Sequence, residues 1–333
     1  MGSRSAAYTI RPADLADAAA VAAVWNAWGL AFRGDEKTTE DQVRRNWQRS
    51  GVDIETDTRV AQLEARGIIG CAVFSDSFWD YARLRGSIYM HPNHADPVVE
   101  RDLLNWIDQR AALALRSIPA GPRVALSHLA MAQDAQRRAL LVERGYAVVH
   151  HAIRMHVTLP RPGQEDEPCL PAGISIRSCD RGSDLPAVSA VVQEAFRGHW
   201  GFVERSTEED VARYERWLDD DPGIDMGVWH LACRGRDVVG VCLGTSRFSG
   251  DPRKAYVFTL GVRDAWRKKG IGRALLSHAI AVFRKRGCAS VDLDVDTANL
   301  TGAVRLYESV GMQPRWQTDE YERELRAAES TPN

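Results

Sequence analysis

The sequence predicts an α/β fold in which two tandem domains each contain a mixed sheet flanked by helices. Three observations support this fold class: the length, an internal repeat, and alternating helix and strand patterns in the second half. The chain has 333 residues, more than one ordinary hydrophobic core accommodates and a natural length for two domains. We therefore expect each half to encode one domain.

The repeat is visible at both ends of the halves. The segment "IRPADLADAAAVAAVW" opens at Ile10 and "IRSCDRGSDLPAVSAVV" opens at Ile176, 166 residues later, and Gly145 and Gly311 share that offset. A leucine pair in the middle is offset by 172. So long a period indicates a duplicated domain rather than a solenoid, although two unrelated α/β domains with common patterns remain an alternative. Residues 160–173 are rich in proline and predict a linker between domains 1–159 and 174–333.

Composition excludes several classes of protein. Apolar residues make up 44%, charged residues 26%, and the formal net charge is −2, so we expect a globular protein with no general attraction for nucleic acid or anionic membranes. No window approaches the ~20 apolar residues of a membrane span, and the N-terminus lacks the apolar core of a signal peptide. The six cysteines are scattered, which predicts reduced thiols in a cytoplasmic protein without a metal site.

Helix and strand patterns alternate within the second half. Asp184 can cap a helix whose first turn contains Pro186. The segments after it are, in order, β-rich runs at 228–235, 237–248 and 255–262, a helix ended by Gly287, an alternating strand at 290–296 and a helix ended by Gly311. This order predicts a mixed sheet flanked by helices.

A glycine-containing turn opens the helix that Gly287 ends. In "WRKKGIGRALLSHAI" three cationic residues, 267–269, precede Gly270 and Gly272. The first amides of a helix lack internal partners at the positive end of its dipole, and glycine lets a phosphate approach the backbone. The pattern favours a pyrophosphate site, although a solvated basic loop with turn glycines is the alternative. It matches neither a P-loop nor a dinucleotide fingerprint.

Two spaced motifs resemble the GNAT (GCN5-related N-acetyltransferase) superfamily. The R/Q-x-x-G-x-G/A and N…A…LY…G signatures match Arg267, Gly270, Gly272, Asn299, Ala303, Leu306, Tyr307 and Gly311. The detailed match covers 174–323 and a weaker one covers 8–159. The tandem layout, though no substrate-specific motif, is similar to that of the mycothiol synthases. The resemblance implies a mostly antiparallel, twisted sheet in each domain.

The resemblance also implies acetyl-CoA as cofactor. Its pyrophosphate would lie on the turn before the helix, its pantetheine along the backbone of Leu260 and Val262, and Tyr307 near the sulfur as general acid. A tyrosine packed in the core is the alternative for Tyr307. The implied cofactor-binding residues are Leu260, Gly261, Val262, Arg267, Lys268, Lys269, Gly270, Ile271, Gly272, Arg273, Ala274, Asn299, Ala303 and Tyr307.

The acceptor site and the general base are less defined. The glutamate that the family usually carries on the strand before the turn is not evident, because Tyr256 and Thr259 stand there. The segment 197–210 follows the first helix, where such enzymes line the acceptor site, although a surface loop packed by its aromatics is the alternative. Our candidates are Glu204 as a tentative base and His199, Trp200, Phe202, Asp294 and Asp296 as substrate residues.

The first half lacks these features. Alignment places Val98 and Glu100 at the two glycines, and Leu141 at Tyr307. We expect 1–159 to be a degenerate domain without cofactor, and 174–333 to be the catalytic domain. The predicted function is an acetyl-CoA-dependent N-acetyltransferase that acts on a small-molecule amine by direct attack, as a monomer or weak dimer in the cytoplasm. A non-catalytic acyl-CoA-binding sensor of the same fold is the alternative.

Overall fold

The computed structural model describes residues 7–34, 38–49, 51–64, 66–76, 83–121, 123–160, 170–220, 224–248, 251–297 and 302–328. The chain forms two compact units. Unit 1 contains Met1–His151 and Trp316–Asn333, and unit 2 contains Ala152–Arg315. Most of the expected linker, 161–169, lies outside the described residues.

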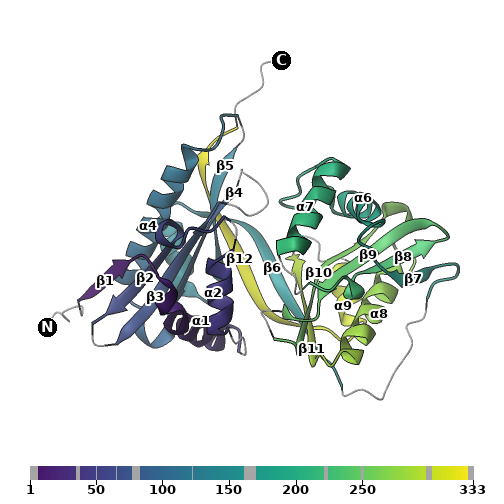
Figure 1. The fold of residues 1–333 in the computed structure, drawn as a ribbon, viewed down its shortest axis with the longest axis horizontal. Coiled ribbons are helices and arrows are strands. Elements are labelled where there is room, and N and C mark those ends of the chain that lie inside the picture. Colours follow the sequence, from purple (N-terminus) through teal and green to yellow (C-terminus); the bar gives the residue numbers. More distant parts are fainter. Residues whose placement is uncertain are drawn as a thin grey trace. The chain divides into compact units, whose positions relative to one another are not determined.

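Unit 1 contains a sheet and helices that pack against it (Figure 1). Its elements are β1 (Tyr8–Arg11), α1 (Ala18–Phe32), α2 (Glu40–Trp47), α3 (Ile54–Asp57), β2 (Thr58–Leu63), β3 (Gly67–Ser75), β4 (Arg83–Met90), α4 (Pro97–Leu115), β5 (Val124–Met131), α5 (Ala135–Glu143), the start of β6 (Ala147–Thr158) and most of β12 (Gln313–Arg326). Short 3-10 turns at Leu15–Asp17 and Pro92–His94 precede α1 and α4. One core cluster includes residues of α4 and α5, and another includes residues of α1 and α2.

Unit 2 repeats this order. Its elements are the end of β6, then β7 (Ser175–Ser178), α6 (Leu185–Phe196), α7 (Thr207–Asp220), β8 (His230–Arg234), β9 (Asp237–Thr245), β10 (Lys254–Val262), α8 (Ile271–Lys285), β11 (Ser290–Asp296), α9 (Ala303–Glu308) and the start of β12. Short 3-10 turns at Met226–Val228 and Asp264–Trp266 precede β8 and α8. The strands expected in the second half are confirmed, but α7 was not predicted.

Each sheet is mixed and mostly antiparallel, as the sequence predicted. The strand order is β1-β2-β3-β4-β5-β12 in unit 1 and β7-β8-β9-β10-β11-β6 in unit 2. The parallel pairs are β4 with β5 and β10 with β11. The parallel pair therefore has the same place in both sheets.

The last strand of each sheet comes from the other half of the sequence. Thr318–Arg326 of β12 pairs with β5 in unit 1, and Ala152–Thr158 of β6 pairs with β11 in unit 2. The compact units therefore differ from the ranges 1–159 and 174–333, because backbone pairing assigns 152–158 to unit 2 and 316–326 to unit 1. An internal sequence repeat shows that two segments are similar. It does not show which of the two sheets a given strand joins.

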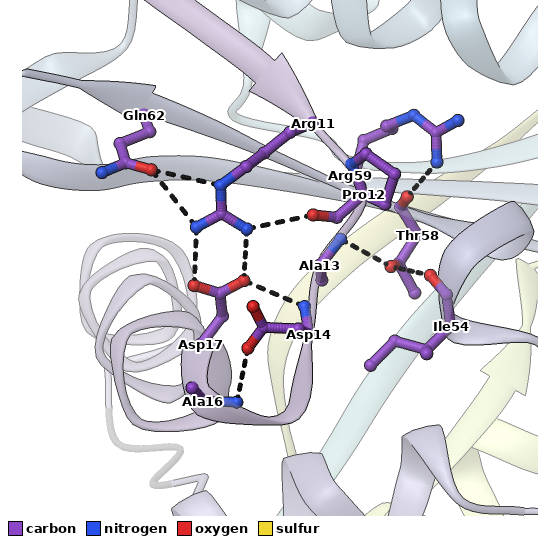
Figure 2. Close-up of polar contacts among 10 residues, drawn as sticks. All are labelled: Arg11, Pro12, Ala13, Asp14, Ala16, Asp17, Ile54, Thr58, Arg59 and Gln62. Carbon is purple, nitrogen blue, oxygen red and sulfur yellow. Dashed lines mark hydrogen bonds and ion pairs between the residues drawn. The ribbon is translucent and has the colours of Figure 1, made fainter.

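An arginine clamp fixes the first strand of unit 1 to its first helix (Figure 2). Arg11 donates to both carboxylate oxygens of Asp17 over 2.6 and 2.8 Å, and also to the side chain of Gln62. The same carboxylate accepts the backbone amide of Asp14 at 3.0 Å. Bidentate charged hydrogen bonds of this kind fix orientation as well as distance.

Unit 2 contains the same clamp. Arg177, 166 residues after Arg11, donates to Asp184 over 2.5 and 2.7 Å, and the amide of Asp180 donates to that carboxylate at 2.8 Å. Asp184 does stand at the N-cap of α6, but its side chain makes no capping bond to the helix, so the expected cap is replaced by this clamp. A shared motif at equivalent positions supports duplication.

One segment passes a length and composition test for a membrane span. Leu15–Phe32 contains 18 residues with a mean hydropathy of 1.3. In unit 1 this segment includes α1, whose residues Ala18, Val21 and Ala22 pack in a core cluster with β2 and β3. The packing explains the apolar character, because a core helix needs an apolar face.

We predict that strand exchange can be detected by paired substitutions. Tyr321 of β12 is buried in unit 1 and Met155 of β6 is buried in unit 2. Tyr321→Ala and Met155→Ala should each cost about 2–5 kcal/mol. Hydrogen exchange should accelerate in β5 for the first variant and in β11 for the second. Acceleration of β11 alone in Tyr321→Ala would contradict the exchange.

Candidate active site

The parallel strands of unit 2 part from each other halfway along their length. The β10–β11 ladder runs from Lys254 and Ser290 to Val257 and Leu293, whereas β10 continues to Val262. A register shift relative to β9 marks the same point on β10. Beyond it, within the described residues, β10 pairs only with β9 and β11 only with β6. Both strands thus offer a free backbone edge that an extended amide can pair with.

The helix after β10 begins without a side-chain cap. Gly270 is its N-cap residue with φ of 81°, and Lys268 is also left-handed with φ of 59°. The helix opens with the hydrogen bond from the amide of Ala274 to the Gly270 carbonyl. The amides that precede Ala274 in the helix are therefore available to an anion. Lys268, Lys269 and Arg273 are exposed around them.

Gly272 is the point where three elements meet. A Cβ at this position would lie 3.0 Å from Cδ1 of Leu306 on α9 and 3.7 Å from Cγ2 of Val262 on β10. We expected this glycine to make room for a phosphate, but in the structure its missing side chain admits Leu306. The helix N-terminus, the free edge of β10 and α9 are therefore adjacent.

The basic residues of the turn have different roles. Arg267 donates to the carbonyls of Ala195 and Val262 over 2.7 and 3.2 Å and pairs with Asp264 at 3.0 Å. It thereby ties the turn to α6 and β10. Lys269 lies 4.7 Å from the ring centroid of Trp266, a cation–π distance. Arg267 shapes the turn, while Lys268 extends from it into solvent.

Tyr307 is a buried residue of α9, on the side of the parted strands that is covered by α8. Its hydroxyl has no hydrogen-bond partner among the described residues, and burial, with a smaller effect from Cys242, raises its pKa to about 12. Cys242 of β9 is also the register partner of Leu260. Tyr307 is therefore a neutral phenol near the free edge. Asn299, the other motif residue, lies outside the described residues, and Ala303 is the first residue of α9.

His199 approaches the free edges from the side of α6. A Cβ on Gly261 would lie 3.3 Å from Cε2 of Phe196, and the rings of Phe196 and His199 are 4.9 Å apart. Burial lowers the pKa of His199, Arg267 lowers it further, and Asp296 opposes both. The negative charge of Asp296 therefore acts on the His199 ring.

The other expected residues of this segment differ in how far they are exposed to solvent. Trp200 and Phe202 are partly buried, and the amide of Phe202 donates to the His199 carbonyl at 3.1 Å. The side chain of Glu204 is 76% exposed and pairs with Arg197 at 3.7 Å. The structure therefore places Glu204 at the surface beside a cation.

Asp294 lies at the parting point and is held on two sides. Arg154 of β6 donates to it over 2.6 and 3.1 Å, and the Tyr256 hydroxyl donates at 2.9 Å. The Arg154 side chain is 9% exposed. Sequence reasoning missed Arg154, because it precedes the expected linker and reaches unit 2 only through strand exchange. The sequence did not predict the hydrogen bond from Tyr256 to Asp294 either, because Tyr256 stood out only as a residue at the place of the family glutamate.

In unit 1 the equivalent helix N-terminus is already satisfied. The β4–β5 ladder also ends early, with Gly86 and His128 as its last pair. Asp96, however, accepts the amide of Val98 at 2.8 Å, and Pro97 has no amide hydrogen to offer. An incoming anion would compete with this carboxylate.

A buried ion pair fills the space beside that helix. Glu100 does not point toward solvent as a repelling charge; it is buried against Arg137 of α5 and accepts from Gln136 at 2.9 Å. Arg137 also donates to the Ile88 carbonyl at 3.1 Å, beyond the end of the parallel ladder. Side chains of unit 1 thus occupy the edge that is free in unit 2.

Comparisons with known proteins support an acetyltransferase fold. The model of the acetyltransferase (GNAT) family matches residues 189–312. The mycothiol acetyltransferase of Salinispora arenicola is 31% identical over 76% of this chain and 76% of its own length, and that of Thermobispora bispora is 34% identical over 50% and 54%. The chain thus matches about half of the latter relative. A crystal structure of a GCN5-related N-acetyltransferase from Sphaerobacter thermophilus has a TM-score of 0.81, with 27% identity, over 97% of this chain and 98% of its own.

We predict that the buried pair of unit 1 is structural. Arg137→Met leaves the Glu100 carboxylate buried without its cation and should lower the free energy of unfolding by about 3–5 kcal/mol. Adding Glu100→Met should recover much of that loss, because two apolar side chains replace two charges. Urea denaturation of the single and double variants measures both effects. A double variant less stable than the single one would refute this account.

Proposed function

The chain belongs to the acetyltransferase (GNAT) family, and from this premise we propose that it transfers acetyl from acetyl-CoA to the amine of a small molecule. The reaction is assigned to unit 2. The observation that carries the proposal is the meeting at Gly272 of an uncapped helix N-terminus, a free strand edge and the helix of Tyr307.

The residues present suit each part of the cofactor. The amides after Gly270 and the exposed Lys268 and Arg273 suit a pyrophosphate. The edge from Leu260 to Val262 suits the two amides of pantetheine. Bound acetyl-CoA would supply an activated thioester carbonyl. Unit 1 is proposed to bind none, since Asp96 and the Glu100–Arg137 pair take the equivalent positions.

Tyr307 is proposed as the general acid. The acceptor nitrogen forms a bond to the acetyl carbon, the carbon–sulfur bond breaks, and the departing thiolate receives a hydrogen bond or proton from the phenol. A phenol with a pKa of about 12 stays protonated at neutral pH. Because a thiol has a pKa near ~8.5, Tyr307 acts mainly on the negative charge developing at sulfur.

The acceptor is proposed to be a small amine that enters on the α6 side. The names of the relatives point to mycothiol chemistry, so the des-acetyl form of mycothiol belongs in the first panel of amines. Trp200, Phe202, Asp294 and Asp296 remain the proposed acceptor-side residues. The described cysteines are free and buried, which supports a cytoplasmic location.

Mass spectrometry of acetylated products after incubation with acetyl-CoA and this panel tests the proposal. An acetylated amine whose formation requires the protein would support it. The competing function is an acyl-CoA sensor. Tight binding of acetyl-CoA without acetylation of any amine in the panel would favour the sensor. The buried Tyr307, whose hydroxyl has no partner in the part of the chain that the structure describes, favours the enzyme.

We predict that charge reversal at the start of α8 weakens cofactor binding. Lys268→Glu should reduce acetyl-CoA affinity at least about tenfold, since one charged contact is worth roughly 1.5–3 kcal/mol. Lys285→Glu makes the same charge change in the last turn of this 15-residue helix and should change affinity less than about twofold, because screening acts over ~8–10 Å. Calorimetry at two salt concentrations compares them. Equal losses would show that only net charge matters.

We predict that Tyr307→Phe lowers kcat about 10²-fold. The ring remains, so packing and acetyl-CoA affinity should hardly change. Tyr214→Phe is the matched control, because it removes the hydroxyl of another buried tyrosine of unit 2. Steady-state kinetics and calorimetry separate the two effects. A Tyr307→Phe variant with wild-type kcat would exclude the general-acid role.

A further inference from the structure

The side chains around the parted strands divide between two faces of the sheet. A Cβ on Gly244 of β9 would lie 3.0 Å from Phe283 of α8, and Leu293 of β11 is in register with Gly244 through Val257, so Leu293 faces α8. The helix of Tyr307 lies on this side as well, since Leu306 reaches Gly272 of α8. Because strand side chains alternate, Asp294 and Asp296 point to the opposite face, where Gly261 meets α6. The proposed acid and these carboxylates thus lie on opposite sides of the free edges.

His199 lies on the face opposite Tyr307 and near both strands. Toward β10, its ring rests on Phe196, which in turn packs against Gly261, four residues past the last β10–β11 pair. Toward β11, the negative charge of Asp296, three residues past that pair, raises the pKa of His199. The hydrogen bond from the His199 amide to the Phe196 carbonyl, 2.9 Å, fixes the turn that holds the ring.

We propose that His199 is the catalytic base that takes the proton from the attacking amine. This inference rests on the proposed function and adds a residue to it. As nitrogen bonds to the acetyl carbon, one N–H proton passes to a ring nitrogen of His199. The carbon–sulfur bond then breaks and its electron pair leaves with the thiolate, which Tyr307 hydrogen-bonds or protonates. The base and acid act from opposite faces of one carbonyl carbon.

The other candidate proton acceptors, Asp294 and Glu204, fit the role less well. Asp294 already accepts hydrogen bonds from Arg154 and Tyr256, so its carboxylate oxygens are engaged within the protein. Glu204 extends into solvent beside Arg197. His199 is partly buried, and the negative charge of Asp296 favours the imidazolium once it forms.

The charged groups facing His199 set its proton affinity. Burial and Arg267, which precedes α8, lower the pKa of His199, whereas Asp296 of β11 raises it. Together these effects lower the pKa of His199 from its usual value of 6.5. Phe196 of α6 is uncharged. The ring is therefore mostly neutral at pH 7 and becomes protonated, and inactive as a base, as the pH falls through that lowered pKa.

The experiment measures the pH dependence of kcat/KM in full-length variants, using an amine that the wild type acetylates. The wild-type profile should bend at a pH below 6.5. His199→Asn should lower kcat about 10²–10³-fold and abolish the bend. His278→Asn is the matched control: it removes an α8 histidine whose pKa is also lowered, and the bend should remain.

Asp296→Asn gives a second, independent readout. Removing a charge that raises the pKa of His199 should move the bend to lower pH, and nuclear magnetic resonance should show the same shift for the His199 ring. A loss of activity in His199→Asn with the bend retained would overturn the proposal, as would disappearance of the bend in Glu204→Gln instead.

Calorimetry of acetyl-CoA on each variant separates this inference from the proposed function. If the wild type and His199→Asn bind acetyl-CoA equally and acetylate with the same pH profile, only the base assignment fails. If the wild type binds acetyl-CoA but acetylates no amine, both fail.

Discussion

The parting of β10 from β11 is the constraint on which the rest of unit 2 depends. A parallel pair inside a mostly antiparallel sheet allows the two strands to diverge after Val257 and Leu293 while each remains bonded to its outer neighbour. The outer ladders hold the opening in place, so a free edge can exist inside a rigid sheet. Gly272 then lets α8 and α9 pack closely beside that edge. Without the divergence, the basic turn would be only a surface loop.

The two units share backbone geometry but differ in the side chains at equivalent positions. Both have the arginine clamp, the same strand order and an early end to the parallel ladder. In unit 1 the helix N-terminus is capped by Asp96 and the adjacent space contains the Glu100–Arg137 pair. In unit 2 the N-cap residue of the corresponding helix is Gly270, so no side chain caps the first backbone amides. A fold therefore provides the opening, and a few side chains determine whether a ligand can use it.

The sequence predicted the elements of unit 2 well because local patterns determine them. Turn glycines, alternating strands and the spaced motif around Tyr307 all report on neighbours within a few residues. The exchange of β6 and β12 could not be predicted, because the pairing of distant strands has no local signature. For the same reason Arg154 was missed. The influence of Asp296 on the pKa of His199 links a strand and a loop about 100 residues apart in sequence. The residue types of the segment alone did not distinguish His199 from Glu204.

Strand exchange gives the first half of the sequence a direct part in the site of the second. Arg154 lies before the linker in the sequence, yet it binds Asp294 at the parting point of β10 and β11. Its charge is compensated there, since the Asp294 and Asp292 carboxylates and the Tyr256 ring surround it. The guanidinium of Arg154 thus offsets negative charge at the parting point. Aspartates without such a partner would favour the ammonium form of a nearby amine, which cannot attack. The first half of the sequence therefore contributes to the site proposed in unit 2 through one strand, which is a physical reason for both halves of the chain to be retained together.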